Sequence, residues 1–246
     1  MGYSDAGPDP RTAQQIASEL ATLLEKGGVG QPVILVGASV GAWNVRVFAS
    51  AREDRVAGLV LVDPRHEQQG PRLVEAGARE TPAWIGWVTR LAPLVGHLGL
   101  SRVAGFAPGP SPSLLSPAVR GFAEATRFRA ATVVAAASEL GHARESAAQV
   151  ARSRRALSVP LVVVSAGQRQ STRVAAVLDE LQEEHLQLST QSCRIIAAAS
   201  GHGIAFDAPE VVVEAIREVL AASRAGRAPD CGVRHAATVS GPVGPR

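Results

Sequence analysis

The sequence has few cysteines, no long apolar run and no concentrated charge, and each absence narrows the class of protein. Its 246 residues include two cysteines, Cys193 and Cys231. These are too few for a disulfide framework, and neither has a Cys or His at metal-ligand spacing nearby. This favours a cytoplasmic protein without a metal site. Because no run of about 18 uncharged apolar residues occurs, no membrane span is expected.

The charge pattern excludes further classes. Residues 1–5 lack the basic region and the apolar run of a secretion signal. The net charge is only +3, and the basic residues are scattered along the chain. Nucleic acid is therefore not an expected partner. The hydrophobic content of 46% is what a large buried core requires.

Strand and helix patterns alternate along the chain. Short apolar runs rich in β-branched residues predict buried strands at 32–37, 56–62, 159–164 and 194–199. Apolar residues at helical spacing predict helices at 12–26 and 42–51 and a final helix that begins at Pro209. This alternation predicts the α/β class, with a mostly parallel sheet flanked by helices.

The spacing of the strands predicts an insertion. Roughly 95 residues separate the second and third strands, where about 2–6 connect ordinary α/β elements. Helical patterns at 84–94, 97–106 and 117–157, with a Pro/Ser-rich hinge at 108–117, fill most of this stretch. We therefore assign residues 1–63 and 158–223 to the core and 64–157 to a helical cap. Residues 224–246 lack an apolar period and are expected to form a disordered tail.

The strongest chemical signal is Gly37-Ala38-Ser39-Val40-Gly41, a G-x-S-x-G sequence between a predicted strand and a predicted helix. Glycines two before and two after the serine permit a tight turn that exposes the hydroxyl at the start of the helix. Ser39 is the candidate nucleophile, and the Val40 N–H is the candidate oxyanion donor. The alternative is a strand-to-helix turn with an incidental serine.

His202 is the candidate general base. It lies in Ser200-Gly201-His202-Gly203, after the last predicted strand and before the final helix. A serine hydroxyl is a poor nucleophile until an imidazole takes its proton, so a serine nucleophile requires such a histidine. The alternative is a histidine of a surface loop. Among the other histidines only His66, which follows a strand end, is retained as a competitor.

Asp63 is the best candidate for the acid that orients the histidine. It ends the second predicted strand and preserves the order Ser, Asp, His. The alternative is an Asp-Pro turn that ends the strand. Glu67 and Asp179 are more distant candidates. Asp207 is expected to cap the helix that begins at Pro209.

Together these motifs resemble the lipase, esterase and peroxidase-like branch of the α/β-hydrolase superfamily. Besides the elbow, the resemblance rests on Gly-Tyr-Ser-Asp at 2–5, the strand and turn at 56–64, and the 200–210 segment that contains His202. It implies an α/β-hydrolase fold without cofactor or metal. In many members the acid follows the strand after the cap, where residues 165–170 contain no carboxylate. Other members place it where Asp63 stands.

The resemblance also predicts a missing front. In this superfamily the Gly-Tyr motif follows the fourth strand, and the preceding strands carry a His-Gly loop with the second oxyanion donor. Here the motif occupies residues 2–5, which implies that about 60 residues, two βα units of about 30, are absent. Loss of one donor costs roughly 3 kcal/mol of transition-state stabilisation. An exposed sheet edge would favour self-association.

The sequence therefore favours a serine hydrolase that acts on a small-molecule acyl substrate, such as an ester, through an acyl-enzyme. Trp84 and Trp87 are candidate lining residues of the acyl pocket, with ordinary helix packing as the alternative. The competing hypothesis is a hydrolase-like remnant that binds an apolar ligand or a partner subunit. Perhydrolysis and C–C bond cleavage use the same triad and stay open.

Overall fold

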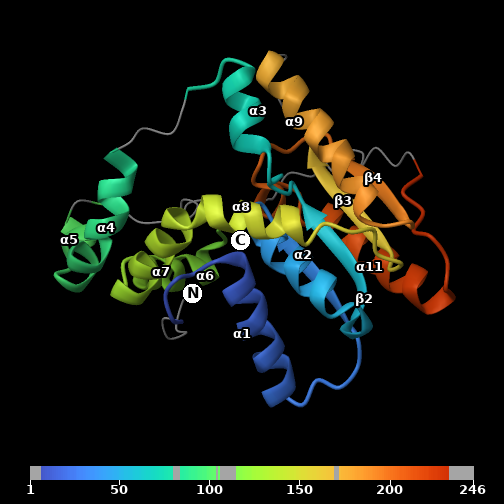
Figure 1. Ribbon diagram of the computed structural model, residues 1–246, viewed down its shortest axis with the longest axis horizontal. Helices are drawn as coiled ribbons and strands as arrows, with labels where there is room; N and C mark the ends of the chain where they lie inside the picture. Colours follow the sequence, from blue (N-terminus) through green and yellow to red (C-terminus); the bar gives the residue numbers. More distant parts are fainter. Residues whose placement is uncertain (1–6, 80–83, 104, 106–114, 169–171, 233–246) are drawn as a thin grey trace.

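A computed structural model describes residues 7–79, 84–103, 105, 115–168 and 172–232 (Figure 1). Within these ranges four strands form one parallel sheet in the order β1-β2-β3-β4. The strands are β1 (Val33–Ala38), β2 (Val56–Val62), β3 (Leu161–Ala166) and β4 (Ser192–Ala197). The Gly-Tyr motif at 2–5 lies outside the described residues.

The helices connect and cover these strands. They are α1 (Ala13–Lys26), α2 (Gly41–Ala51), α3 (Gln69–Glu75), α4 (Trp84–His97), α5 (Leu100–Val103), α6 (Pro117–Arg127), α7 (Ala130–Gly141), α8 (Ala143–Arg152), α9 (Arg173–Glu184), α10 (Ile204–Asp207) and α11 (Pro209–Ala225). Short 3₁₀ turns at Glu53–Arg55 and His185–Leu188 lead into β2 and toward β4. The predicted helix at 117–157 is thus three helices, α6, α7 and α8.

Both faces of the sheet are buried, which explains why its strands are continuous apolar runs rather than alternating ones. On one face Leu59, Leu61 and Leu161 pack in a core with α1, α2 and α8. On the other face Val60, Val162 and their neighbours pack against α11. The predicted α/β fold with a parallel sheet flanked by helices is confirmed.

The segment between β2 and β3 divides into two parts. Helix α8 packs against α1 and α2 and so belongs to the layer that covers the sheet. Helix α4 packs mainly against α7, and Figure 1 shows α4 to α7 grouped to one side of the strands. The 64–157 cap assignment is therefore too broad at its end, and only the α4–α7 group remains a candidate cap. Most of the hinge predicted at 108–117, residues 108–114, lies outside the described residues.

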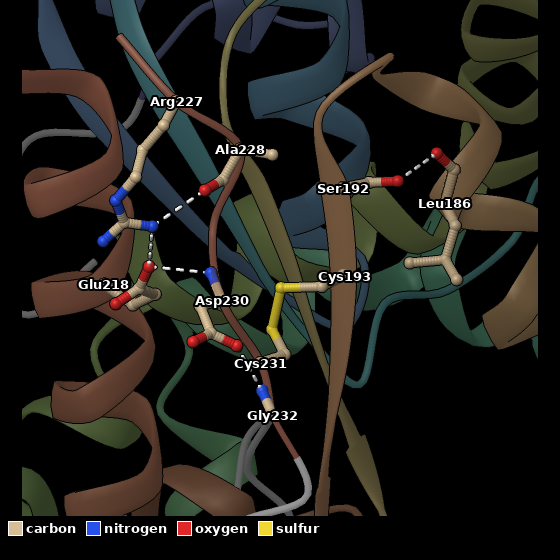
Figure 2. The surroundings of a disulfide bond; sticks show 9 residues. All are labelled: Leu186, Ser192, Cys193, Glu218, Arg227, Ala228, Asp230, Cys231 and Gly232. Atoms are coloured by element: carbon tan, nitrogen blue, oxygen red, sulfur yellow. Dashed lines mark hydrogen bonds and ion pairs between the residues drawn. A yellow bond between two sulfur atoms is a disulfide. The ribbon is translucent and has the colours of Figure 1, made fainter. Parts of the chain in front are cut away.

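The segment after α11 is attached to the sheet. A disulfide joins Cys231 to Cys193 on β4, and Glu218 of α11 accepts hydrogen bonds from the Arg227 side chain and the Asp230 N–H (Figure 2). The predicted disordered tail therefore does not begin at residue 224; residues 233–246 lie outside the described part. Because disulfides persist in oxidising compartments, this pairing removes the basis of the cytoplasmic expectation.

Strand β1 is an outer strand of the described sheet, and its Val36 side chain is 43% exposed. The backbone N–H and C=O groups at the free edge of an outer strand are where another chain can pair. Self-association through this edge stays a prediction. Within the described ranges, no helix is long and apolar enough to cross a membrane.

Candidate active site

The turn between β1 and α2 places Ser39 in a strained backbone conformation. Its φ is +51°, a value that non-glycine residues seldom adopt, and its N–H donates to the Val62 carbonyl at 3.0 Å. This bond ties the turn to the end of the neighbouring strand β2. Such a strand–turn–helix arrangement is what the G-x-S-x-G sequence predicts, and strain of this kind concentrates at functional sites.

The two glycines of the elbow are not equally constrained. A Cβ at Gly37 would lie 2.7 Å from Val45 Cγ2 and 2.8 Å from Ala42 Cα, whereas a Cβ at Gly41 would meet no heavy atom within 4 Å. Only Gly37 is therefore required for close approach of the strand to the helix. The expectation that both flanking glycines are sterically necessary is wrong for Gly41.

Replacement of Gly37 by alanine is expected to destabilise the fold by about 1–3 kcal/mol, because the added methyl overlaps the backbone of α2. Gly41→Ala is the matched control and should change the free energy of unfolding by no more than about 1 kcal/mol, in the stabilising direction. Urea unfolding of both variants measures the difference. Equal destabilisation of the two would contradict this packing of the elbow.

His202 lies within hydrogen-bonding distance of both other predicted catalytic residues, Ser39 and Asp63. His202 Nε2 is 3.0 Å from Ser39 Oγ, and His202 Nδ1 is 2.7 Å from Asp63 Oδ2. A carboxylate can only accept, so the tautomer that fits carries its proton on Nδ1 and leaves Nε2 free to accept from the serine. The Asp63 side chain is largely buried, whereas the His202 ring is exposed to an incoming molecule.

Asp63 is fixed by the strands around it. It follows β2 directly, with a φ of +39°, and its N–H donates to the Val164 carbonyl at 2.7 Å. Its second carboxylate oxygen, Oδ1, accepts from the Ala166 N–H at 3.3 Å. Strand β3 thus supplies a donor that holds the Asp63 carboxylate.

The loop that carries His202 is anchored on both sides. The Gln168 N–H donates to the Ser200 carbonyl at 2.9 Å, and the buried Ser200 hydroxyl donates to Asp207 Oδ2 at 2.9 Å. Asp207 ends α10, and the cap position of α11 is Ala208, without a side-chain cap bond. The expectation that Asp207 caps α11 is therefore wrong: it holds the histidine loop. In the sequence, the indication of this role was that Asp207 lies five residues after His202.

The Val40 N–H lies at the start of α2, where backbone donors and the helix dipole favour negative charge. Within the described ranges this N–H has no hydrogen-bond acceptor. The position fits the predicted oxyanion donor.

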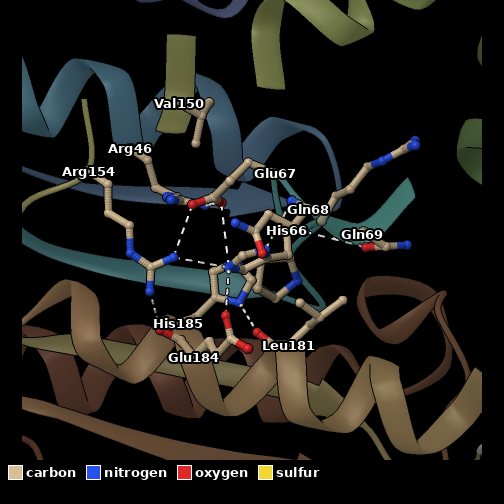
Figure 3. Close-up of polar contacts among 12 residues, drawn as sticks. Arg46, His66, Glu67, Gln68, Gln69, Val150, Arg154, Leu181, Glu184 and His185 are labelled. Atoms are coloured by element: carbon tan, nitrogen blue, oxygen red, sulfur yellow. Dashed lines mark hydrogen bonds and ion pairs between the residues drawn. The ribbon is translucent and has the colours of Figure 1, made fainter. Parts of the chain in front are cut away.

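The competing candidates His66 and Glu67 lie in a separate buried cluster (Figure 3). Arg46 Nη1 donates to Glu67 Oε2 at 2.7 Å, and Arg154 Nη1 donates to Glu67 Oε1 at 3.0 Å. His66 Nδ1 accepts from the Gln68 N–H at 3.1 Å. Glu67 and His66 thus contact residues of this cluster rather than the elbow.

The remaining acid candidate and one further histidine also have other partners. Asp179 lies on α9 and pairs with Arg194. His185 is buried, and its ring faces His66 edge-on with 5.1 Å between centroids. The 3₁₀ turn after α9 directs His185 inward, where its Nδ1 lies 2.7 Å from the Leu181 carbonyl.

Burial sets the protonation of this cluster. Burial, reinforced by the charge of Arg46, lowers the pKa of His185 to about 3, and burial also lowers the pKa of His66. Burial raises the pKa of Glu67, but the hydrogen bond and charge of Arg46 outweigh it and lower that pKa to about 2. Near neutral pH the cluster therefore contains neutral histidines and an ionised Glu67.

Acid is expected to destabilise the fold through His185. The unfolded chain binds a proton below the ordinary histidine pKa of about 6.5, whereas folded His185 does so only near 3. Its contribution is complete above pH 6.5 and falls by about 1.4 kcal/mol per pH unit below it. His185→Asn keeps a donor for Leu181 and should remove about one proton from the slope between pH 6.5 and 5. An unchanged slope in urea unfolding would contradict the burial of a neutral His185.

The two tryptophans predicted to line the acyl pocket stand on α4. The Trp84 side chain lies outside the described residues. Trp87 is 65% exposed, and the Arg90 guanidinium stacks over its ring at 5.5 Å. This exposure does not fit the packing alternative, and a pocket-lining role for both residues stays a prediction.

The described residues include no cluster of three or more side chains suited to hold a metal ion.

Comparison with curated proteins finds relatives that the chain matches over part of their length. Among curated proteins, the chain is 28% identical over 244 residues to the "Probable transporter efuK" of Hormonema carpetanum, covering 88% of this chain and 34% of that protein. It is 44% identical over 66 residues to lipase LipV of Mycobacterium tuberculosis, covering 27% of this chain and 25% of the lipase. The chain thus spans about a third and a quarter of the length of these relatives.

Solved structures extend the likeness to the fold. A thermophilic esterase from Thermogutta terrifontis superimposes with a TM-score of 0.59 at 26% identity, over 91% of this chain and 77% of that one. Cfl2 from Burkholderia cenocepacia has a TM-score of 0.56 at 22% identity, over 88% and 74% of the two chains. The sequence profile of the α/β hydrolase family matches residues 1–215. The chain belongs to the α/β hydrolase family.

Proposed function

We propose that the chain is a serine hydrolase that cleaves small acyl substrates, carboxylic esters first among them, through an acyl-enzyme. The observation that carries this proposal is the continuous relay from Asp63 through His202 to Ser39, with contacts of 2.7 and 3.0 Å. Family membership and the likeness to an esterase and a lipase support hydrolysis. The arrangement has the three roles that acyl transfer requires: nucleophile, base and orienting acid.

In the first half-reaction Ser39 Oγ attacks the carbonyl carbon of the ester while His202 Nε2 takes the hydroxyl proton. Asp63 holds the Nδ1–H and stabilises the imidazolium that forms. His202 then gives the proton to the leaving alkoxide, and the acyl group remains on Ser39. A water molecule, deprotonated by the same nitrogen, attacks the acyl-enzyme and releases the carboxylic acid and the free hydroxyl.

The negative charge on the carbonyl oxygen develops close to the start of α2. The Val40 N–H is the donor that we assign to it, supported by the positive end of the helix dipole. A second donor belongs to the general arrangement of such sites and is not assigned to any described residue. The group of helices α4–α7 is the proposed cap over the acyl chain.

A pre-steady-state burst tests the acyl-enzyme. Mixing the chain with p-nitrophenyl butyrate should release p-nitrophenolate in a rapid phase equal to the concentration of active sites, followed by slower turnover. Gln14→Ala, on the exposed surface of α1, is the control and should keep the burst. Turnover without a burst, under conditions where a covalent thiol or amine trap also finds no acyl group, would contradict the covalent route.

A further inference from the structure

We propose that Arg46 and Trp43 of α2 are positioning residues that clamp the segment after Asp63 onto the nucleophile helix and so set the reach of the acid to His202. The inference rests on the proposed function and adds residues to its machinery. They act through the backbone that carries Asp63. The clamp is defined as the contacts of Trp43 and Arg46 with residues 65 and 67.

The clamp consists of contacts at regular spacing on both partners. Trp43 and Arg46 are three residues apart and so lie on one face of α2. Trp43 Nε1 donates to the Arg65 carbonyl at 2.7 Å, and Arg46 Nη1 donates to Glu67 Oε2 at 2.7 Å. The Arg65 guanidinium also stacks over the Trp43 ring at 5.5 Å. One helix face thus holds residues 65 and 67 of the segment that follows Asp63.

A third contact links this segment to the nucleophile itself. The Arg65 N–H donates to the carbonyl of Ser39 at 3.1 Å. The backbone of the nucleophile and the segment that begins with the acid are therefore joined directly, within two residues of Asp63. A shift of residues 65–67 along α2 would move Asp63 relative to Ser39.

The backbone of Asp63 explains why a clamp is needed. Asp63 and Ser39 both have positive φ, at +39° and +51°, and such residues persist only where their surroundings fix them. Asp63 is followed by Pro64, which has no N–H to anchor the turn. The Pro64 carbonyl accepts from Gln182 Nε2 at 3.0 Å, and the next anchors along the chain are those of Arg65 and Glu67.

The Arg46–Glu67 ion pair is buried, and its burial restricts it to one geometry. The Arg46 and Glu67 side chains are 5% and 3% exposed, and Arg154 holds the other Glu67 oxygen at 3.0 Å. A buried pair contributes little net stability compared with apolar side chains of the same size, but it fixes one geometry. Stability and positioning are therefore separable by replacing both partners at once.

The decisive variant is Arg46→Met/Glu67→Leu, which replaces the buried pair by apolar side chains and leaves Arg154 bonded to the Glu184 carbonyl and Gln187. With p-nitrophenyl butyrate we expect kcat to fall by roughly 10–100-fold with KM unchanged, because a small displacement of the acid affects the transition state. Arg11→Met is the matched control: it removes a partly buried arginine paired with Glu19 and Glu139, and should leave kcat unchanged.

Two further readouts separate positioning from folding. Trp43→Phe removes the N–H that reaches Arg65 and keeps one aromatic ring at the buried position, so it should lower kcat in the same way even if the double variant does not fold. Of the two single variants Arg46→Lys and Arg46→Met, Arg46→Lys retains a cationic donor and should therefore keep more of the wild-type activity. The NMR signal of the His202 Nδ1 proton, which reports its hydrogen bond to Asp63, should shift in Trp43→Phe and in the double variant but not in Arg11→Met.

A folded double variant and a folded Trp43→Phe variant that keep the wild-type kcat and the wild-type His202 signal would overturn the clamp. If the wild-type chain itself has no esterase activity, the proposed function fails, and the proton signal alone still decides whether the clamp positions Asp63. The two failures are thus distinguishable.

Discussion

Replacing Ser39 by alanine is expected to lower kcat/KM for p-nitrophenyl esters by on the order of 10⁴-fold or more, because the relay then has no nucleophile to deprotonate. His202→Ala should have an effect of similar size, since Ser39 Oγ is 3.0 Å from His202 Nε2 and no other described histidine contacts it. The two losses should not add in the double variant, because the residues act as one unit.

The backbone at position 39 requires its own control. Ser39 has a φ of +51°, where alanine is strained and glycine is not. Ser39→Gly should therefore be as inactive as Ser39→Ala and unfold at a urea concentration closer to that of the wild type. Ser18→Ala, on the exposed side of α1, should retain full activity. An active Ser39→Gly variant would show that another nucleophile performs the reaction.

Asp63→Asn is expected to lower kcat by up to about 10⁴-fold with the fold intact. Asparagine cannot accept from His202 Nδ1 in the same way and favours the tautomer with the proton on Nε2, which is then unable to take the serine proton. The substitution suits the backbone, because asparagine tolerates the positive φ of +39°. Steady-state kinetics and circular dichroism measure the two effects separately.

The comparison variant is Asp179→Asn, which removes the other aspartate considered for the triad. Asp179 lies on α9 and pairs with Arg194 of β4, so its variant should retain wild-type kcat. If Asp179→Asn were inactive while Asp63→Asn kept its activity, the acid would be misassigned.

The buried strands, the elbow and the candidate triad could be predicted from sequence because each is a local pattern. Buried parallel strands are continuous apolar runs, so β1 and β2 were predictable to within a residue. The elbow is a local sequence motif, and His202 follows the last strand as the order of the triad requires. Asp63 was predictable as a candidate because it stands at the carboxyl end of β2, beside the end of β1.

The features that could not be predicted depend on contacts between residues distant in the chain. No local pattern distinguishes Gly37 from Gly41. An added Cβ would contact Ala42 and Val45 at Gly37, whereas at Gly41 it would have no heavy atom within 4 Å. His185 is surrounded by polar helical residues in sequence and is buried only because Arg46, His66 and α9 converge on it. The pairing of Cys193 with Cys231 requires the segment after α11 to run back along β4, which composition does not encode.

The most direct test of the central claim is labelling of the purified chain with a fluorophosphonate probe, followed by intact mass and peptide mapping. The relay of Asp63, His202 and Ser39 predicts one adduct per wild-type chain, located on Ser39, and no adduct in Ser39→Ala or His202→Ala. A folded wild-type chain that takes no label, or that is labelled at another serine, would contradict the assignment of Ser39 as an activated nucleophile.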